Sequence, residues 1–341
     1  MRKVTREKFN LFTAQVASLN DVGSVTDKFA VAPSIQQTLE TKIQESASFL
    51  KQINMVGVDE QEGEAIGLGV GSTVASTTDT TQKDRETADP STLVVDRYRC
   101  EQTNFDTHIT YQKLDAWAKF TDFQARLRDA IIQRQALDRI VIGFNGVKRV
   151  ATSNRANNPL LQDVNIGWLQ KYRENAAQRV MTSGKVDTEI SIGEHCDYEN
   201  IDALVMDAIN NLIDPWYQDD TGLVAICGRK LLSDKYFPMV NQSQRATDQL
   251  ATDIILSQKR IGGLPAARVP FFPADAILIT RFDNLSLYWQ NEKRRRNIID
   301  NSRRDRIENF ESSNDAYVIE DYGCGALIEN IVMHEAAGVG A

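Results

Sequence analysis

Histidine, the side chain that most often serves as a general base, is scarce in this chain. Its three copies, His108, His195 and His334, lie far apart. A catalytic triad or a zinc site would therefore have to gather single residues from distant segments. His195 is next to Cys196, but sequence neighbours usually point apart, so we do not expect a nucleophile and base there. The sequence predicts no catalytic residue, no metal site and no cofactor.

Two other stretches have residue types that could do chemistry. Asp219 and Asp220 lie in WYQDDTG, whose composition is typical of a turn, so a solvated loop is favoured over an acid/base pair. Residues 67–72, GLGVGS, are rich in glycine. Their spacing is not a dinucleotide fingerprint, no helix follows and a Walker lysine is missing. A flexible or bulged strand is the better interpretation.

Residues 292–308, EKRRRNIIDNSRRDRIE, form the one conspicuous charge run. Its basic side chains alternate with Glu292, Asp300, Asp305 and Glu308, so ion pairing between chains competes with phosphate binding. Phosphate binding would make the chain a DNA-associated accessory or packaging protein. That alternative stays open at this point.

Composition favours a folded protein without a disulfide framework. The 341 residues are 42% hydrophobic, enough for two domains or one large body. Acidic residues outnumber basic ones, 47 to 39, and the net charge of −8 argues against a dedicated nucleic-acid-binding chain. The cysteines are widely spaced, as expected for reduced, buried thiols in a cytosol: Cys100, Cys196, Cys227 and Cys324.

The N-terminal residues 1–20 predict a basic amphipathic helix with Phe9, Phe12, Val16 and Leu19 on one side. This segment lacks the apolar core of a secretory signal, and no run approaches the roughly 20 apolar residues that span a bilayer. We expect a soluble chain made in a cytoplasm. The following stretch, NDVGSVTDKFAVAP, is interpreted as an exposed connector.

The strongest helical pattern lies between residues 114 and 146. Its apolar residues recur every three or four positions: Leu114, Trp117, Phe120, Phe123, Leu127, Ile131, Leu137, Val141 and Phe144. Thr121 and Gln124 form a capping-box pattern, so a fresh helix is predicted from near Asp122 to Ile142. At about 1.5 Å per residue this helix is a rod of roughly 30 Å.

Other segments predict a mixed α+β chain. A second helix is expected over 34–54, with a capping box at Ser34 and Gln37, and strands are expected on either side of residues 77–92. Residues 77–92 contain no large apolar side chain. This segment is either a solvated surface loop or a two-stranded arm that finds its partners on another copy of the protein.

The second half of the chain alternates between helical and strand patterns. Helices are predicted at 163–177, 199–213 and 229–240, and strands at 223–227, 267–272, 276–282, 285–290 and through 304–333. The early helix and the late strands are expected to share one core, with residues near 200–290 as an inserted lobe.

Four long stretches carry a family resemblance: GFNGVKR (143–149), NPLLQDVNIGWLQKYR (158–173), DKYFPMVN (234–241) and SQKRIGGLPAARVPFFPADAILITRFDNLSLYW (257–289). Together with the ends of the chain, they resemble the major capsid proteins of P-two-type temperate phages, the peduoviruses. Departures lie mainly near 181–197 and after Met333, where loops and ends vary.

This resemblance implies the Hong Kong 97 (HK97) capsid fold. On it, residues 1–30 are a scaffold-like or cleavable segment and 31–54 the N-terminal arm. Residues 55–111 are the extended E-loop, and 112–195 are the peripheral domain with its spine helix near 122–142. Residues 196–290 are the axial domain and 291–341 the return strands of the peripheral domain.

The resemblance also implies a function without catalysis. The subunit is expected to assemble as pentamers and hexamers into an icosahedral shell around double-stranded DNA. Expected partners are a scaffolding protein, a prohead protease, the portal protein and, by weak contact, packaged DNA. The location implied is the virion capsid, with assembly in the host bacterial cytoplasm. Because the family trims its subunit, we expect cleavage near the Phe29–Ala30 bond; the alternative is a permanent N-terminal arm that clasps a neighbour.

Overall fold

The computed structural model describes residues 1–70, 75–85, 87, 91–120, 122–185, 188–233, 235 and 259–334. The chain divides into two compact units of mixed α and β structure. Unit 1 comprises Met1–Gly63, Arg99–Gly167 and Ser286–Tyr317, and unit 2 comprises Glu64–Tyr98, Trp168–Leu285 and Val318–Ala341. Within the described ranges, no helix is both long enough and apolar enough to cross a bilayer.

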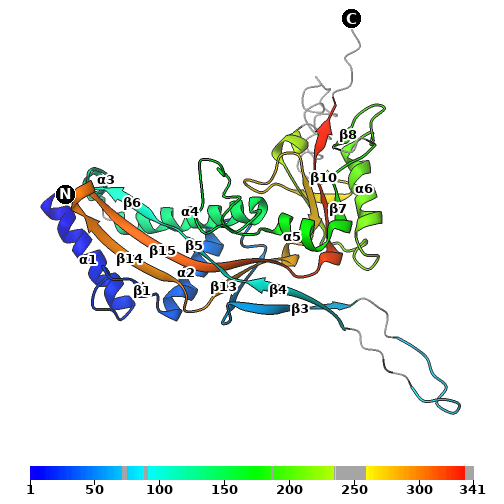
Figure 1. Cartoon of the computed structure of the whole chain (residues 1–341), viewed down its shortest axis with the longest axis horizontal. Helices are drawn as coiled ribbons and strands as arrows, with labels where there is room; N and C mark the ends of the chain where they lie inside the picture. The colour runs from blue at the N-terminus through cyan, green and yellow to red at the C-terminus, as the bar shows by residue number, and fades with distance from the viewer. Residues whose placement is uncertain are drawn as a thin grey trace, which may run out of the picture. The chain divides into compact units, whose positions relative to one another are not determined.

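Unit 1 is built on a seven-stranded sheet (Figure 1). Its strand order is β1 (Phe29–Ala30), β14 (Arg295–Asn301), β15 (Arg306–Ile319), β13 (Leu285–Gln290) and β2 (Asn54–Val58), with β5 (Glu101–Asn104) and β6 (Thr107–Thr110) also on β15. β14 and β15 form an antiparallel hairpin in which Arg295 lies opposite Ser312 and Asn301 opposite Arg306. Because side chains alternate along a strand, Arg296 and Ile298 share one face and Arg295 and Ile299 the other.

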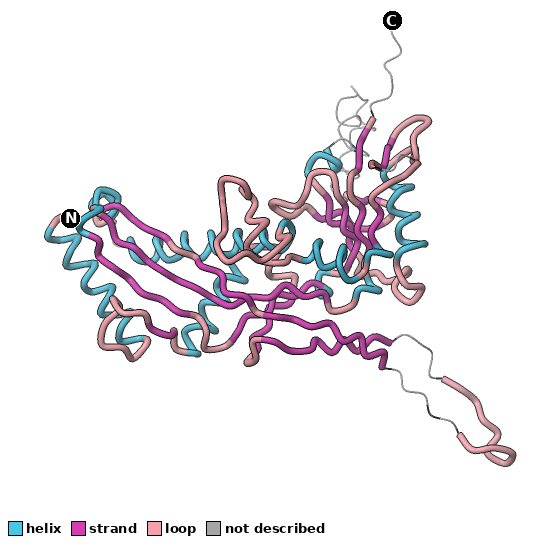
Figure 2. Tube along the Cα trace, viewed as in Figure 1, coloured by secondary structure: helices cyan, strands magenta, loops and turns pink. Residues whose placement is uncertain are grey.

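Helices cover the Arg296 face of this sheet. They are α1 (Lys3–Leu19), α2 (Pro33–Ser46), α3 (Tyr111–Trp117) and α4 (Phe123–Asn145). Figure 2 shows α1, α2 and α4 running beside the long strands β14 and β15. A small core cluster joins these layers: Val16, Val25, Phe29, Val31, Leu114, Ile298 and Ile307. The N-terminal helix is therefore packed into unit 1.

The long central helix is confirmed as α4. It begins after Asp122, as expected, and ends at Gly146. A Cβ atom on Gly146 would lie 2.3 Å from the backbone oxygen of Asn165, so only glycine fits where the chain turns back. The helix cap is not the predicted one, because no side chain caps at Asp122, and Thr121 lies outside the described residues.

The predicted apolar face of α4 was only partly right. Trp117 at the end of α3 and Phe120 before α4 are exposed, and Ile131 and Leu137 on α4 are half-buried. The buried stripe instead passes through Ile132, Ala136 and Ile140, and it includes the polar residues Gln135 and Arg139. A sequence pattern that counts only apolar residues misses a helix face with polar positions at its centre.

The second helix is shorter than predicted. α2 ends at Ser46, and residues 48–52 form turns, although Leu50 and Ile53 are buried as expected. The predicted capping box is wrong, because the helix starts at Pro33 and its N-cap position is Ala32. Proline at the first helical position suits this start, since its fixed φ matches the helix and its missing N–H would have no partner there.

Unit 2 has a six-stranded sheet in the order β10 (Arg260–Ile261), β11 (Leu264–Ala267), β9 (Val224–Cys227), β12 (Ile277–Thr280), β16 (Ala326–Ile328) and β7 (Val180–Met181). β8 (Ile190–Ile192) and β17 (Ile331–Met333) form a separate parallel pair. The helices α5 (Trp168–Asn175) and α6 (Ile201–Leu212) belong to this unit. α6 starts where the Asn200 side chain accepts a hydrogen bond from Ala203 N at 2.9 Å.

Most predicted elements of unit 2 are present. The strand predicted at 223–227 is β9, the one at 276–282 contains β12, and the helix predicted at 199–213 is α6. The strand predicted at 267–272 is wrong, because β11 ends at Ala267 and turns follow it. Of the helix predicted over 229–240, residues 229–233 and 235 are helical and the others lie outside the described residues.

A two-stranded sheet completes the fold. β3 (Glu62–Val70) pairs with β4 (Ser91–Arg99), and the described tip residues 75–85 are almost all exposed. We call residues 62–99 the arm. The other strands within residues 55–111, which are β2, β5 and β6, join the sheet of unit 1.

Candidate functional site

The histidines are not brought together. His195 is an exposed turn residue with a φ of 64°, His334 follows β17, and His108 lies on β6 opposite Glu308. The His195 imidazole lies 3.7 Å from the Glu194 carboxylate, whereas the Cys196 thiol donates to the Glu194 backbone oxygen. In the described part of the chain, no three His, Cys, Asp or Glu side chains cluster as metal ligands would.

The acidic pair and the cysteines have structural surroundings. Asp220 accepts a hydrogen bond from Gly222 N at 2.8 Å and pairs with Arg281 at 3.1 Å, which makes it a turn residue, while Asp219 is exposed. Cys100, Cys227 and Cys324 are buried as predicted. Burial raises the pKa of Cys100 and Cys324 to about 12 and that of Cys227 to about 11, so these thiols stay protonated near neutral pH.

Part of the charge run 292–308 is used inside unit 1. Arg294 is buried and hydrogen-bonded to Glu311 at 2.8 Å, and Arg306 pairs with Glu308 at 2.6 Å. Asp300 binds both Arg6 and the Tyr111 hydroxyl, which ties α1 and α3 to β14. Lys293, Arg295, Arg303 and Arg304 are exposed, so part of the positive charge of this run remains at the surface.

Sequence reasoning missed a buried ion cluster at the centre of unit 1, made by Glu40, Gln135, Arg139, Arg294, Glu311, Ser313 and Asp315. Arg139 on α4 reaches both Glu40 on α2 and Asp315 on β15; its Nε and Nη2 donate to Asp315 at 3.0 Å each. Arg294 joins Glu40 to Glu311, with its Nη1 donating to Glu40 at 2.6 Å. The cluster therefore ties together α2, α4, β15 and the residue that precedes β14.

Carboxylates outnumber guanidiniums in this cluster, three to two. Burial alone would raise the pKa of Glu311, but the charges of Arg294 and Arg296 hold it at about 2. Asp315 shifts the other way, because burial and the nearby negative charge of Glu40 raise its pKa against the opposing effect of Arg139. One sequence feature could have indicated this cluster. Gln135 and Arg139 are four residues apart, so they lie on the same face of a helix that packs against the rest of the unit.

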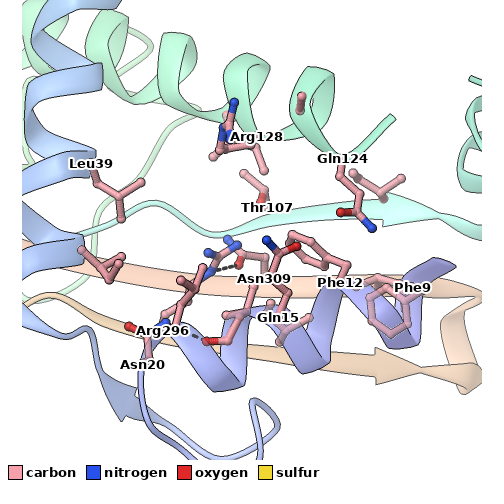
Figure 3. A pocket seen from close by; sticks show the side chains of 18 of the residues that line it. Phe9, Phe12, Gln15, Asn20, Leu39, Thr107, Gln124, Arg128, Arg296 and Asn309 are labelled. Carbon is pink, nitrogen blue, oxygen red and sulfur yellow. Dashed lines mark hydrogen bonds between the residues drawn. The ribbon is translucent and has the colours of Figure 1, made fainter. Parts of the chain in front are cut away.

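A pocket of about 510 Å³ lies between α1, α2, α4 and the sheet of unit 1. Figure 3 shows Phe9, Phe12 and Gln15 extending from α1, Leu39 from α2, and Gln124 and Arg128 from α4. Other apolar walls are Val16, Ile35, Leu114, Ile131, Ile298 and Ile307. On the strands, Arg296 Nε donates to Asn309 Oδ1 at 2.7 Å. This is an apolar space with a small polar floor.

The segment after α1 is not the exposed connector that the sequence indicated. Val25, Phe29 and Val31 are buried, and Phe29–Ala30 forms β1 opposite Arg296 and Arg295 of β14. The composition misled because only three apolar residues, well spaced among polar ones, are enough to anchor a segment on a sheet edge. The Phe29–Ala30 bond lies inside a paired strand, so a protease reaches it only after β1 leaves β14.

The described tip of the arm is polar and locally ordered. Thr81 donates from its backbone N at 3.0 Å and from its hydroxyl at 2.6 Å to Asp79, which lowers the pKa of that carboxyl. This is an Asx-type turn, and it holds the tip without an apolar core. The described tip of the arm has no apolar core, and its exposed polar side chains are suited to polar contacts.

Comparison with known proteins gives the context for these features. Residues 8–331 match the model of the family described as "Phage major capsid protein, P2 family". The capsid protein of Escherichia phage P2 is 54% identical over 340 residues, covering 97% of this chain and 95% of that one. The major capsid protein of Serratia phage KSP20 is 41% identical over 339 residues, covering 97% of each chain.

A solved structure agrees with the sequence relatives. A chain in the satellite phage P4 procapsid that includes the size determination (Sid) protein is 51% identical and superposes with a TM-score of 0.82, covering 98% of this chain and 99% of that chain. Both the sequence and the mixed α/β fold are thus those of phage shell subunits, and this chain belongs to the P2 family of phage major capsid proteins.

Proposed function

We propose that this chain assembles as pentamers and hexamers that close into an icosahedral shell around a double-stranded DNA genome. The observation that carries the proposal is the family match over residues 8–331. The exposed arm with its polar tip supports it. A shell subunit acts through repeated complementary contacts with copies of itself.

The finer assignment within the HK97-like fold is part of the same proposal. In it, α4 is the spine helix of a peripheral domain spanning 112–195, and residues 291–341 are the return strands of that domain. Residues 31–54 are the N-terminal arm, 55–111 the E-loop centred on β3 and β4, and 196–290 the axial domain. The length of α4, Phe123–Asn145, and its contact with α2 and the sheet suit a rigid strut.

The N-terminal residues 1–30 serve assembly before they are removed near the Phe29–Ala30 bond. The docking of this segment supports a role in the unprocessed subunit, because Val16, Val25 and Phe29 are buried and Arg6 binds Asp300. Removal then exposes the sheet edge at β14 and changes the surface available for contacts. A permanent arm that clasps a neighbour is the alternative.

The partners proposed are a scaffolding protein, the prohead protease and the portal protein, with the subunit assembling in the host cytoplasm and ending in the virion capsid. The procapsid with a similar subunit includes a size determination protein, which supports an accessory partner during assembly. Packaged DNA makes weak contacts only, as the net charge of −8 would favour.

Electron microscopy of the chain expressed with its scaffold and protease partners tests the shell, and intact-mass measurement of the mature particles tests the cleavage. We expect closed icosahedral particles and a new N-terminus within residues 20–34. Monomers in every scaffold condition would contradict the shell proposal. A subunit that still begins at residue 1 or 2 in mature particles would contradict cleavage alone.

A further inference from the structure

The pocket beneath α1 contains one buried polar atom without a hydrogen-bond partner, next to the Arg296 guanidinium. Asn309 uses its Oδ1 to accept from Arg296, but its Nδ2 is buried without a hydrogen-bond partner. The Arg296 guanidinium donates a hydrogen bond to the side chain of Asn309. Among the described residues, no carboxylate lies within ion-pair distance of this guanidinium. A buried donor without an acceptor costs folding free energy, so the site favours a molecule that brings acceptor atoms.

The charges around the pocket favour an anion. Burial lowers the pKa of Arg296, and the nearby Arg294 lowers it further, although Glu311 opposes both effects. Lys42 and Arg128 also line the pocket, against one lining carboxylate, Asp122. A carboxylate next to Arg296 would supply the negative charge that the burial of this guanidinium calls for.

Volume and lining decide what kind of molecule fits. A space of about 510 Å³ lies in the range of small-molecule sites, roughly 300–1,000 Å³. A helix about 10 Å across would place only about one turn in it. A single alkyl chain fits whole and would contact Phe9 and Phe12 on α1, Leu39 on α2 and Ile131 on α4.

We propose that this pocket binds a medium-chain fatty acid, whose alkyl chain lies between α1, α2 and α4 and whose carboxylate accepts from Asn309 Nδ2 and the Arg296 guanidinium. This site goes beyond the shell function and does not depend on it. Because the alkyl chain contacts Phe9 and Phe12, a bound fatty acid holds α1 on the sheet. Occupancy therefore slows the release of α1 and β1 from β14.

Calorimetric titration of the purified, unassembled full-length chain with dodecanoate, below its micelle-forming concentration, tests the proposal. We expect saturable binding at one site per chain. Decanoate should bind weaker by about fourfold for each methylene removed. Dodecanol, which lacks the carboxylate, should bind at least about tenfold weaker, since a hydrogen bond to a charged group is lost. Equal affinity for dodecanol would overturn the assigned polar floor.

Two variants and a matched control locate the site. Asn309→Asp keeps an acceptor for Arg296 but places a like charge against the ligand, and Arg296→Met removes the cation; each should weaken dodecanoate at least about tenfold. Arg295→Met is the control, because Arg295 is exposed on the opposite face of β14 and should bind as the unaltered chain does. Absent binding to the unaltered chain, or unchanged binding to Asn309→Asp, sinks the proposal.

Discussion

At the scale of single residues, the buried ion cluster is the feature with the largest energetic consequences. Arg139 is fully buried between Glu40 and Asp315. Burying charges is costly, and the cost is offset only while every partner is present. The intact cluster is therefore compatible with a stable fold, whereas removal of any one of its charged side chains should destabilise the fold.

The variant Arg139→Met should lower the free energy of unfolding by about 3–5 kcal/mol, because it leaves two buried carboxylates without their shared cation. Urea unfolding followed by circular dichroism measures this loss. Arg134→Met is the matched control on the same helix, since Arg134 is 62% exposed and pairs with Asp138 at the surface. Its cost should stay under about 1 kcal/mol. Equal costs for the two variants would contradict the importance of burial here.

The same cluster predicts how stability depends on pH. The pKa of Glu311 is lowered from 4.5 to about 2 in the folded chain. A lowered carboxyl pKa gives stability that is present above the unfolded value and is lost as the pH falls through the folded value. The variant Glu311→Gln should therefore remove about 3 kcal/mol of the stability lost between pH 4.5 and 2.

Asp315 contributes with the opposite sign, because its raised pKa gives stability below its unfolded value that is lost as the pH rises. Urea midpoints of the unaltered and Glu311→Gln chains across pH 2 to 5 separate the two effects. Glu60→Gln, a change at an exposed residue, should leave the profile as it is. A Glu311→Gln profile that is identical to that of the unaltered chain would refute the assignment.

At the scale of elements, local patterns predicted helices well where one face is apolar. α1, α4 and α6 follow from apolar residues at steps of three and four. The face of α4 was predicted less well, because Gln135 and Arg139 are buried by partners from α2 and β15. Those partners lie 99 to 176 residues away in the sequence. A pattern within one helix cannot predict a hydrogen-bond partner that is so distant in the sequence.

For the edge strand β1, the sequence predicted too little structure. Its neighbours looked like an exposed connector, yet Phe29 and Val31 are buried against unit 1. Strand pairing with β14 depends on a segment some 265 residues later, so it cannot be read from the composition of residues 21–33. The pocket under α1 was unpredictable for the same reason, since six separate segments line it.

Removal of residues 1–30 should destabilise unit 1, because Val16, Val25 and Phe29 leave its core cluster. The expected loss is roughly 3 kcal/mol or more in the free energy of unfolding, with greater binding of an apolar fluorescent dye. A chain with Val4→Ser and Leu11→Ser is the matched control, since both residues are exposed on α1. Its free energy of unfolding should change by less than about 0.5 kcal/mol. An unchanged midpoint in the shortened chain would mean that the segment is not packed in solution.

At the scale of the whole molecule, the two units each hold a core of their own, yet the chain passes between them repeatedly. Neither core includes the described tip of the arm. Stability and assembly are therefore carried by different residues. Core substitutions should act first on folding, and substitutions in the arm tip should act on contacts with other copies.

Deletion of residues 77–92 separates these two roles. The shortened subunit should fold with an unfolding free energy within about 0.5 kcal/mol of the unaltered one, since the deleted segment has no large apolar residue. Shell yield should fall at least about tenfold, because losing even about 1.4 kcal/mol per contact lowers each association constant tenfold. Replacing residues 77–85 with glycine and serine at constant length distinguishes lost side-chain contacts from a lost span. Sedimentation and electron microscopy of the co-expressed particles give the yield. If both altered chains form shells as abundantly and as stably as the unaltered one, the arm tip is solvated in the shell and other surfaces hold the subunits together.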